Sequence, residues 1–147
     1  MSTMAAQATQ VYSLFIKATP EQIWDAITKP EFSHKYFYGS HVTVTPEAYR
    51  SLDDDGGDLV VGTVLEYEPP ARLVHSWRAL YDPETAVEEE SRVTWEIEAQ
   101  EGGYSKLTVV HDQLEGAPKT AESVARGWSY VLSGLKTLLE TGTPLAG

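Results

Sequence analysis

The last third of the chain carries its longest regular pattern of apolar positions. From residue 119 to residue 141, apolar side chains recur at intervals of three or four residues and form one stripe, with polar residues such as Arg126 and Glu140 on the opposite face. This period predicts a single long amphipathic helix. Pro118 precedes its start, and Gly142 stands where a left-handed C-cap is favoured. Because such a stripe is not stable in water, the rest of the chain must cover it.

The beginning of the chain predicts one strand followed by two short helices. Residues 10–18 alternate apolar and polar side chains, as a strand with one buried face does. Thr19 and Gln22 have the spacing of a capping box, and Pro20 occupies the first helical position. Pro30 ends this first helix and opens a second, shorter one.

Between residue 40 and residue 112 the pattern changes to that of antiparallel strands joined by turns. We expect strands at residues 41–45, 58–68, 72–81, 91–100 and 104–112, a turn over residues 53–57 and a charged loop over residues 82–90. The alternation is clearest in residues 91–100. The side chains expected to share inner faces are Thr63, Leu65, Tyr67, Leu73, His75, Trp77, Val93, Trp95, Ile97, Leu107, Val109 and His111.

The order of these elements indicates the fold class. One strand, two short helices, several antiparallel strands and one long helix are accommodated by an α+β domain whose curved antiparallel sheet grips the terminal helix with its apolar face. We expect a single domain over residues 10–142, with a flexible N-terminal tail over residues 1–9 and a C-terminal tail over residues 143–147.

Composition and charge exclude several classes of partner. The chain has 147 residues, 41% of them hydrophobic, and a formal net charge of −11. This charge would repel nucleic acid and anionic membrane surfaces, so we expect neither as a partner. With no cysteine, the chain has no disulfide, thiolate metal site or cysteine nucleophile. Its first ten residues lack the pattern of a secretion signal, and no apolar run reaches membrane-spanning length, so we expect a cytoplasmic protein.

Four segments resemble a known family. They are residues 16–27, 69–77, 91–96 and 127–142. Together they are similar to the SRPBCC superfamily, whose fold is called START-like or helix-grip, and within it to the branch of the activator of heat-shock-protein-90 ATPase homologue-like proteins. The resemblance covers roughly residues 10–142, and the tryptophan-containing terminal helix is its most specific part. It implies the same gripped-helix architecture that the order of elements predicts.

The resemblance also implies three kinds of function. Most proteins of this fold bind a small hydrophobic or aromatic molecule between sheet and helix, which is the function we expect here. A minority are cyclases or hydrolases that use the same cavity. The eponymous branch stimulates a chaperone ATPase, but its founders carry a further N-terminal chaperone-binding domain that we do not expect in this chain. A chaperone partner is therefore a less expected alternative, and a homodimer is another form of protein interaction.

Inner-face aromatic and histidine side chains are the candidate ligand contacts. The set comprises Tyr36, Phe37, Tyr67, His75, Trp77, Trp95, His111, Trp128 and Leu132. Aromatic rings suit an apolar or flat ligand, although they would equally fill a core. His75 and His111 could anchor the polar end of a ligand or act in acid–base chemistry, but a buried histidine bonded to a neighbour is the expectation. His111 and Asp112 should point to opposite faces and form no dyad.

Other patterns have simpler explanations. Gly127 and Gly134 lie at the border of the helical stripe, where they could leave space for a ligand or, as we favour, allow close packing of the helix. The aspartates of residues 53–58 lack the spacing of a calcium loop and predict a solvated turn. We expect residues 88–90 to be exposed charge. We identify no catalytic constellation, metal site or cofactor site in the sequence.

Overall fold

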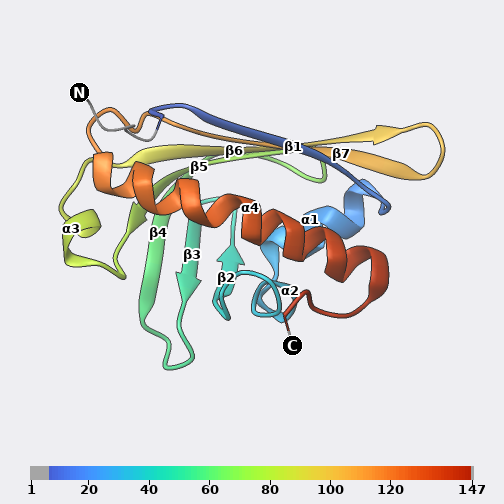
Figure 1. The fold of residues 1–147 in the computed structure, drawn as a ribbon, viewed down its shortest axis with the longest axis horizontal. Helices are drawn as coiled ribbons and strands as arrows, with labels where there is room; N and C mark the ends of the chain where they lie inside the picture. Colours follow the sequence, from blue (N-terminus) through green and yellow to red (C-terminus); the bar gives the residue numbers. More distant parts are fainter. Residues whose placement is uncertain (1–6, 147) are drawn as a thin grey trace.

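The sheet has seven antiparallel strands, and the long helix α4 lies across one of its faces (Figure 1). The computed structural model describes residues 7–146. The strand order is β1-β7-β6-β5-β4-β3-β2. The strands are β1 (Gln10–Ile16), β2 (His41–Val44), β3 (Ala48–Leu52), β4 (Asp58–Glu68), β5 (Arg72–Ala79), β6 (Ser91–Gln100) and β7 (Tyr104–Asp112). The helices are α1 (Pro20–Thr28), α2 (Pro30–Ser33), α3 (Pro83–Ala86) and α4 (Pro118–Thr141). This arrangement confirms the expected α+β helix-grip fold.

The local signals read from the sequence determine the helix ends. The Gln22 backbone N–H donates to Thr19 Oγ1 at 3.1 Å, and the Thr19 N–H donates to Gln22 Oε1 at 2.8 Å, so the expected capping box is present. At the C-terminal end of α4, Gly142 has a φ of 81° and its N–H donates to the Leu138 carbonyl. The apolar stripe of α4 packs on the sheet, with Leu135 fully buried.

Two short elements were not expected. β3 pairs with both β2 and β4, and a tight turn at Thr45 joins it to β2. Its five residues bury only Tyr49 and Ser51, which is too short a pattern to identify a strand from sequence. α3 is a single turn inside the expected charged loop, capped by the Asp82 side chain, which accepts from the Glu84 N–H at 2.8 Å.

A β-bulge corrects the faces assigned to β4. The register of β4 on β5 shifts between Val64 and Glu66. Before the shift Val64 lies opposite His75, so Val64 is on the inner face; Leu65 is 56% exposed. The expectation that Thr63 and Leu65 share the inner face with Tyr67 is therefore wrong, because one extra residue inverts the alternation. Tyr67, after the bulge, lies opposite the buried Leu73 and is therefore on the inner face, as expected.

Glu88, in the loop between α3 and β6, caps the N-terminus of α4. The backbone N–H groups of Lys119 and Thr120 each donate to its carboxylate at 2.8 Å, as does the Thr120 hydroxyl. The expectation of simple exposed charge at residue 88 is wrong, since helix N–H groups without intrahelical partners attract a carboxylate. Partial burial would raise the pKa of Glu88, but these hydrogen bonds outweigh it and hold the pKa below its usual range. The cap fixes the first turns of α4.

Side chains of α4 also cover part of the free edge of β1. Lys136 Nζ donates to the Phe15 carbonyl at 2.8 Å, and the Lys17 N–H donates to a Glu140 carboxylate oxygen at 2.8 Å. Gln10 Nε2 reaches back and donates to the Ala121 carbonyl at 3.0 Å. All three bonds join the first strand, or Lys17 next to it, to α4, and the bonds to Phe15 and Lys17 occupy backbone groups at or next to the edge that β1 otherwise exposes.

The two expected tails fall partly outside the described part of the chain. Residues 1–6 and 147 lie outside it, so the flexible N-terminal tail stays a prediction. Within residues 7–146, Ala8 packs against the core and its carbonyl accepts from the Leu114 N–H, while residues 143–146 form neither helix nor strand. Over the same described range, every helix is too short or too polar to cross a bilayer.

Candidate ligand-binding site

A pocket opens between the first half of α4 and the strands β3, β4 and β5, whose ribbons lie behind that half of the helix in Figure 1. Its volume is about 430 Å³, in the range of pockets that hold small organic ligands. The residues around it are Phe37, Tyr38, Ser40, Ser51, Leu59, Val60, Trp77, Tyr81, Ser123, Val124, Arg126, Gly127, Trp128 and Val131. They come from three strands, the helix, the loop after α2 and the loop after β5.

The pocket wall is apolar and its rim is aromatic and polar. Trp77 and Trp128, 4% and 2% exposed, form the deep wall with Val60, Val124 and Val131. The rim carries large exposed side chains, Tyr38 and Tyr81, together with the exposed Arg126. A ligand would therefore bury its apolar part against the tryptophans and keep one end near the rim.

Three of the nine expected contact residues line this pocket: Phe37, Trp77 and Trp128. Five others lie in the core beside or behind it and are at most 5% exposed, namely Tyr36, His75, Trp95, His111 and Leu132. Tyr67 lies elsewhere, 37% exposed, with its ring edge-on to Trp24 of α1 at 5.5 Å. Of the nine expected residues, three therefore line the pocket, five belong to the core and one, Tyr67, lies away from the pocket.

His75 is locked in the core by a tryptophan. Trp95 Nε1–H donates to His75 Nε2 at 3.0 Å, and His75 Nδ1 lies 2.9 Å from the Ser76 carbonyl. These partners require a neutral ring with its proton on Nδ1. The Tyr49 ring stacks on the imidazole at 3.8 Å, with 6° between the planes. Burial lowers the pKa of His75 to about 4.

His111 makes the equivalent bond to the helix. Trp128 Nε1–H donates to His111 Nδ1 at 3.1 Å, so His111 Nε2 carries the proton and donates to Ser91 Oγ at 2.7 Å. Burial, and next the repulsion of a charged His75, lower the pKa of His111 to about 3. Both histidines are bonded core residues, as expected. Asp112 points to the outer face, where it pairs with Arg92.

The Trp128–His111 bond gives the pocket a fixed back wall. The Trp128 ring also contacts four other rings edge-on or tilted: Tyr12 at 6.4 Å, Phe37 at 6.0 Å, Trp77 at 5.9 Å and Trp95 at 5.4 Å between centroids. Such contacts add to the stability that burial alone gives. A ligand in the pocket would therefore meet a surface that is already ordered, which lowers the entropic cost of binding.

The two helix glycines have different roles. A Cβ at Gly134 would lie 3.2 Å from Tyr36 Cβ, so this glycine allows α4 to pack closely against the segment after α2. A Cβ at Gly127 would meet nothing nearer than the Tyr38 hydroxyl at 3.6 Å, and Gly127 borders the pocket. The favoured explanation, close packing, holds for Gly134, whereas Gly127 leaves space at the site.

Sequence reasoning missed the residues of the rim. Tyr38 takes a left-handed conformation with a φ of 53°, directly before Gly39, and this bend directs the loop toward α4. Its ring stacks on Tyr130 at 5.1 Å. Tyr81 Oη lies 2.7 Å from Ser123 Oγ and joins the loop after β5 to the helix. An aromatic residue before a glycine is a weak signal of such a bend, and Tyr81 offered none.

Comparison with known proteins identifies the family. The family model described as "Activator of Hsp90 ATPase homolog 1-like protein" matches residues 17–140, which include every element from α1 to most of α4. The chain belongs to this family. This confirms the resemblance seen in the sequence. A comparison with curated proteins finds no match.

Solved structures similar to this chain share its fold at low sequence identity. An HSP90 activator from Plasmodium falciparum is 19% identical, with a TM-score of 0.72 over 90% of this chain and 96% of that one. The Aha1 dimer from Colwellia psychrerythraea is 16% identical, with a TM-score of 0.70 over 92% and 98%. CalU16 from Micromonospora echinospora is 21% identical, with a TM-score of 0.69 over 94% and 77%.

Proposed function

We propose that this activator-like domain binds a small, flat, mostly apolar molecule in the pocket between α4 and β3–β5. The observation that carries the proposal is a cavity of about 430 Å³ whose deep wall consists of tryptophan and valine side chains. Apolar area removed from water contributes roughly 25 cal/mol per Å², and ring stacking on Trp77 or Trp128 would add to it. The family match is consistent with a binding role.

One hydrogen-bond donor in the pocket wall lacks a partner. Trp77 Nε1 is buried and has no hydrogen-bond partner among the described residues, although its ring borders the pocket. A buried donor without an acceptor costs about 1–3 kcal/mol. A ligand acceptor placed beside this ring could remove that cost, which favours a flat molecule carrying a carbonyl or ether oxygen over a pure hydrocarbon.

Binding explains the site better than catalysis does. Within residues 7–146, the pocket wall contains no histidine and no carboxylate, the side chains that most often transfer protons. His75 and His111 are fully buried, and both ring nitrogens of each are already in hydrogen bonds. A cyclase or hydrolase activity would need a general acid or base that this wall does not present.

Replacing Gly127 with a larger residue, which would fill part of the pocket, tests the proposal. The neutral dye N-phenyl-1-naphthylamine fluoresces in apolar sites, and we expect it to bind the wild-type protein with a Kd of about 0.1 mM or tighter. In Gly127→Leu the new side chain would occupy pocket space, so dye affinity should fall at least about tenfold. A fluorescence titration measures this change.

Ala125→Leu is the matched control, because it adds a leucine to α4 at an exposed position outside the pocket. It should bind the dye as the wild type does. Equal dye affinity in Gly127→Leu and in Ala125→Leu, with both proteins folded by circular dichroism, would refute a ligand site in this pocket.

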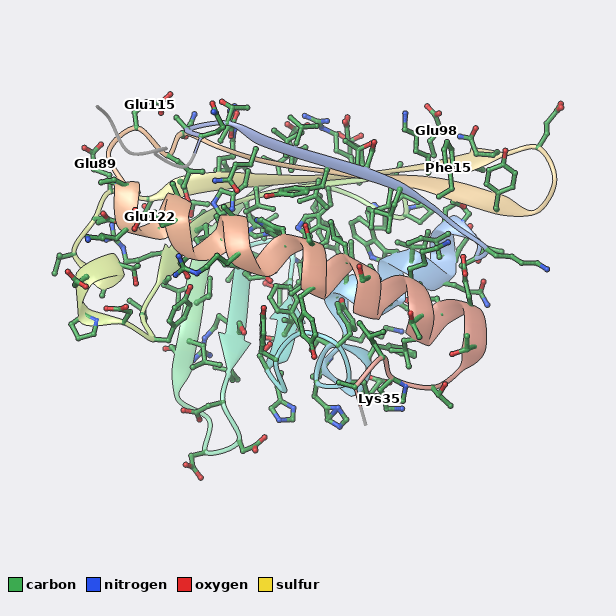
Figure 2. All side chains as sticks on the ribbon, viewed as in Figure 1. Phe15, Lys35, Glu89, Glu98, Glu115 and Glu122 are labelled. Atoms are coloured by element: carbon green, nitrogen blue, oxygen red, sulfur yellow. The ribbon has the colours of Figure 1, made fainter. Side chains whose placement is uncertain are left out.

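A second candidate is self-association through the outer side of β1 and β7. Val11, Phe15 and Tyr104 are 62%, 52% and 38% exposed there, and the Phe15 and Tyr104 rings contact each other edge-on at 5.6 Å. Figure 2 shows Phe15 on the outer side of the sheet, away from α4. The structure from Colwellia psychrerythraea is described as a dimer. The Plasmodium falciparum protein is described as an HSP90 activator, and stimulation of a chaperone ATPase by this chain is a further proposal of the same class.

Phe15→Glu tests this second candidate. A buried, unpaired carboxylate at a contact between two copies is unfavourable, so the variant should be monomeric at protein concentrations where the wild type is dimeric. Light scattering coupled to size exclusion measures the mass. A wild-type protein that remains a monomer across the concentration range would exclude self-association.

A further inference from the structure

The pocket rim holds Arg126. Among the residues that the structure describes, it is the only arginine without an ion pair or hydrogen bond. Each of the other four arginines makes an ion pair or donates to backbone carbonyls: Arg50 to Asp58, Arg72 to Glu66 and Glu96, Arg78 to the carbonyls of Ala86 and Glu88, and Arg92 to Asp112. Across residues 7–146, Arg126 alone among them makes no ion pair and no hydrogen bond.

This lack of a partner contrasts with the overall charge. The chain has 22 acidic residues against 11 lysines and arginines, and acidic side chains lie around the beginning of α4. Figure 2 shows Glu89, Glu115 and Glu122 around that end of the helix. Glu122 is one turn before Arg126, a spacing at which helix ion pairs form, but none of the ion pairs among the described residues joins these two side chains. The guanidinium is therefore available at the pocket rim.

Two hydroxyl groups lie on the same side of the pocket. Ser123 precedes Arg126 by three residues, so the two share a helix face, and both border the pocket. The Ser123 hydroxyl is 2.7 Å from that of Tyr81, so this pair retains at least one O–H that could donate to a ligand. A guanidinium and a hydroxyl pair above an apolar wall match a carboxylate attached to an aromatic ring.

We infer that the pocket selects flat aromatic molecules that carry an acidic group, with Arg126 binding the acid and the tryptophan wall binding the rings. This inference rests on the proposed binding function and adds the class of ligand. In a protein with a net charge of −11, an anion would be repelled at most of the surface. Arg126 is thus the specificity-determining residue, because it separates an aromatic acid from a neutral molecule of the same shape.

A pair of displacing compounds tests the inference. 2-Naphthoate and 2-naphthamide have the same ring system and nearly the same shape, and differ in the charge of the head group. Each is used to displace N-phenyl-1-naphthylamine, whose own binding reports the apolar pocket. In the wild type, we expect the naphthoate to displace the dye at a concentration about tenfold lower than the naphthamide, as a charge-assisted pair predicts.

Arg126→Gln should abolish this preference, so that the naphthoate and the naphthamide displace the dye at concentrations equal within about twofold, whatever the dye affinity of the variant. Lys35→Gln is the charge-matched control: Lys35 is an exposed cation after α2, outside the pocket, and Figure 2 shows it below α4, far from the first turns of that helix. This variant should keep the wild-type preference.

The outcomes separate the inference from the proposed function. If the dye binds but the two compounds displace it equally, or if Arg126→Gln keeps the preference, the role of Arg126 is refuted and the apolar site stands. If Lys35→Gln also loses the preference, general electrostatics and not Arg126 selects the acid, and the inference again fails. If the dye does not bind to the wild type, both the site and its selectivity are refuted.

Discussion

Acidification from pH 7 to pH 5 should lower the free energy of unfolding by about 4 kcal/mol, and the two core histidines should cause most of the loss. In an unfolded chain a histidine has a pKa of about 6.5, whereas burial lowers the pKa of His75 to about 4 and that of His111 to about 3. As the pH falls below 6.5, the unfolded state binds protons that the folded state cannot. Each histidine then lowers the free energy of unfolding by about 1.4 kcal/mol per pH unit.

The sign of this effect is fixed by the direction of the two shifts. Above pH 6.5 both states hold neutral rings and the full stability is present; below it, stability is lost until the folded-state pKa is reached. Urea denaturation at pH 7, 6 and 5 measures the change. His34→Gln, at an exposed position, is the control, and its free energy of unfolding should change between pH 7 and pH 5 as that of the wild type does. Ring NMR signals of His75 and His111 that titrate near pH 6.5 in the folded protein would contradict the expectation.

Gly62→Ala should destabilise the domain by at least about 3 kcal/mol or prevent folding. A Cβ at this position would lie 1.8 Å from the Ser76 carbonyl oxygen and 2.8 Å from its carbon. Both strands would have to separate, because the obstructing atoms belong to the backbone of β5. Separation would also disturb the Tyr49–His75 stack, since Tyr49 pairs with Gly62 and its ring reaches His75 on β5.

Gly127→Ala is the matched control for this substitution. Its Cβ would make only ordinary contacts, and alanine is favoured over glycine within a helix by roughly 1 kcal/mol. Thermal melting should therefore show a lower Tm for Gly62→Ala and an equal or higher Tm for Gly127→Ala. A Gly62→Ala protein as stable as the wild type would show that β4 and β5 can relax around the new atom.

The periodic parts of the fold could be predicted from the sequence, and the irregular parts could not. The long stripe of α4 and the alternation of β6 give enough repeats to fix both type and face. β3 offers one buried aromatic, Tyr49, which is too little. The faces of β4 depend on a bulge at Leu65 that no residue pattern marks.

The candidate site was predictable only in part, for a geometric reason. Alternation along a strand tells which side chains face inward, but not where along the sheet α4 leaves space. His75, Trp95 and Trp128 all face inward as predicted, yet of these three only Trp128 borders the pocket. Arg126 was correctly expected on the polar face of the helix. Its place at the pocket rim depends on how α4 crosses the sheet, which the sequence pattern does not encode.

The pairing of the first strand with the last determines when this domain can form during synthesis. Ile16 pairs with Ser105, 89 positions later (105 − 16), and a ribosome adding about 5–20 residues per second needs roughly 4–18 s to make that stretch. Until then β1 has no neighbouring strand, and its edge stays open until Lys136 and Glu140 have been added. The pocket too is incomplete until Val131 on α4 has been added. A nascent chain must therefore be kept from pairing with other chains until synthesis has passed residue 140.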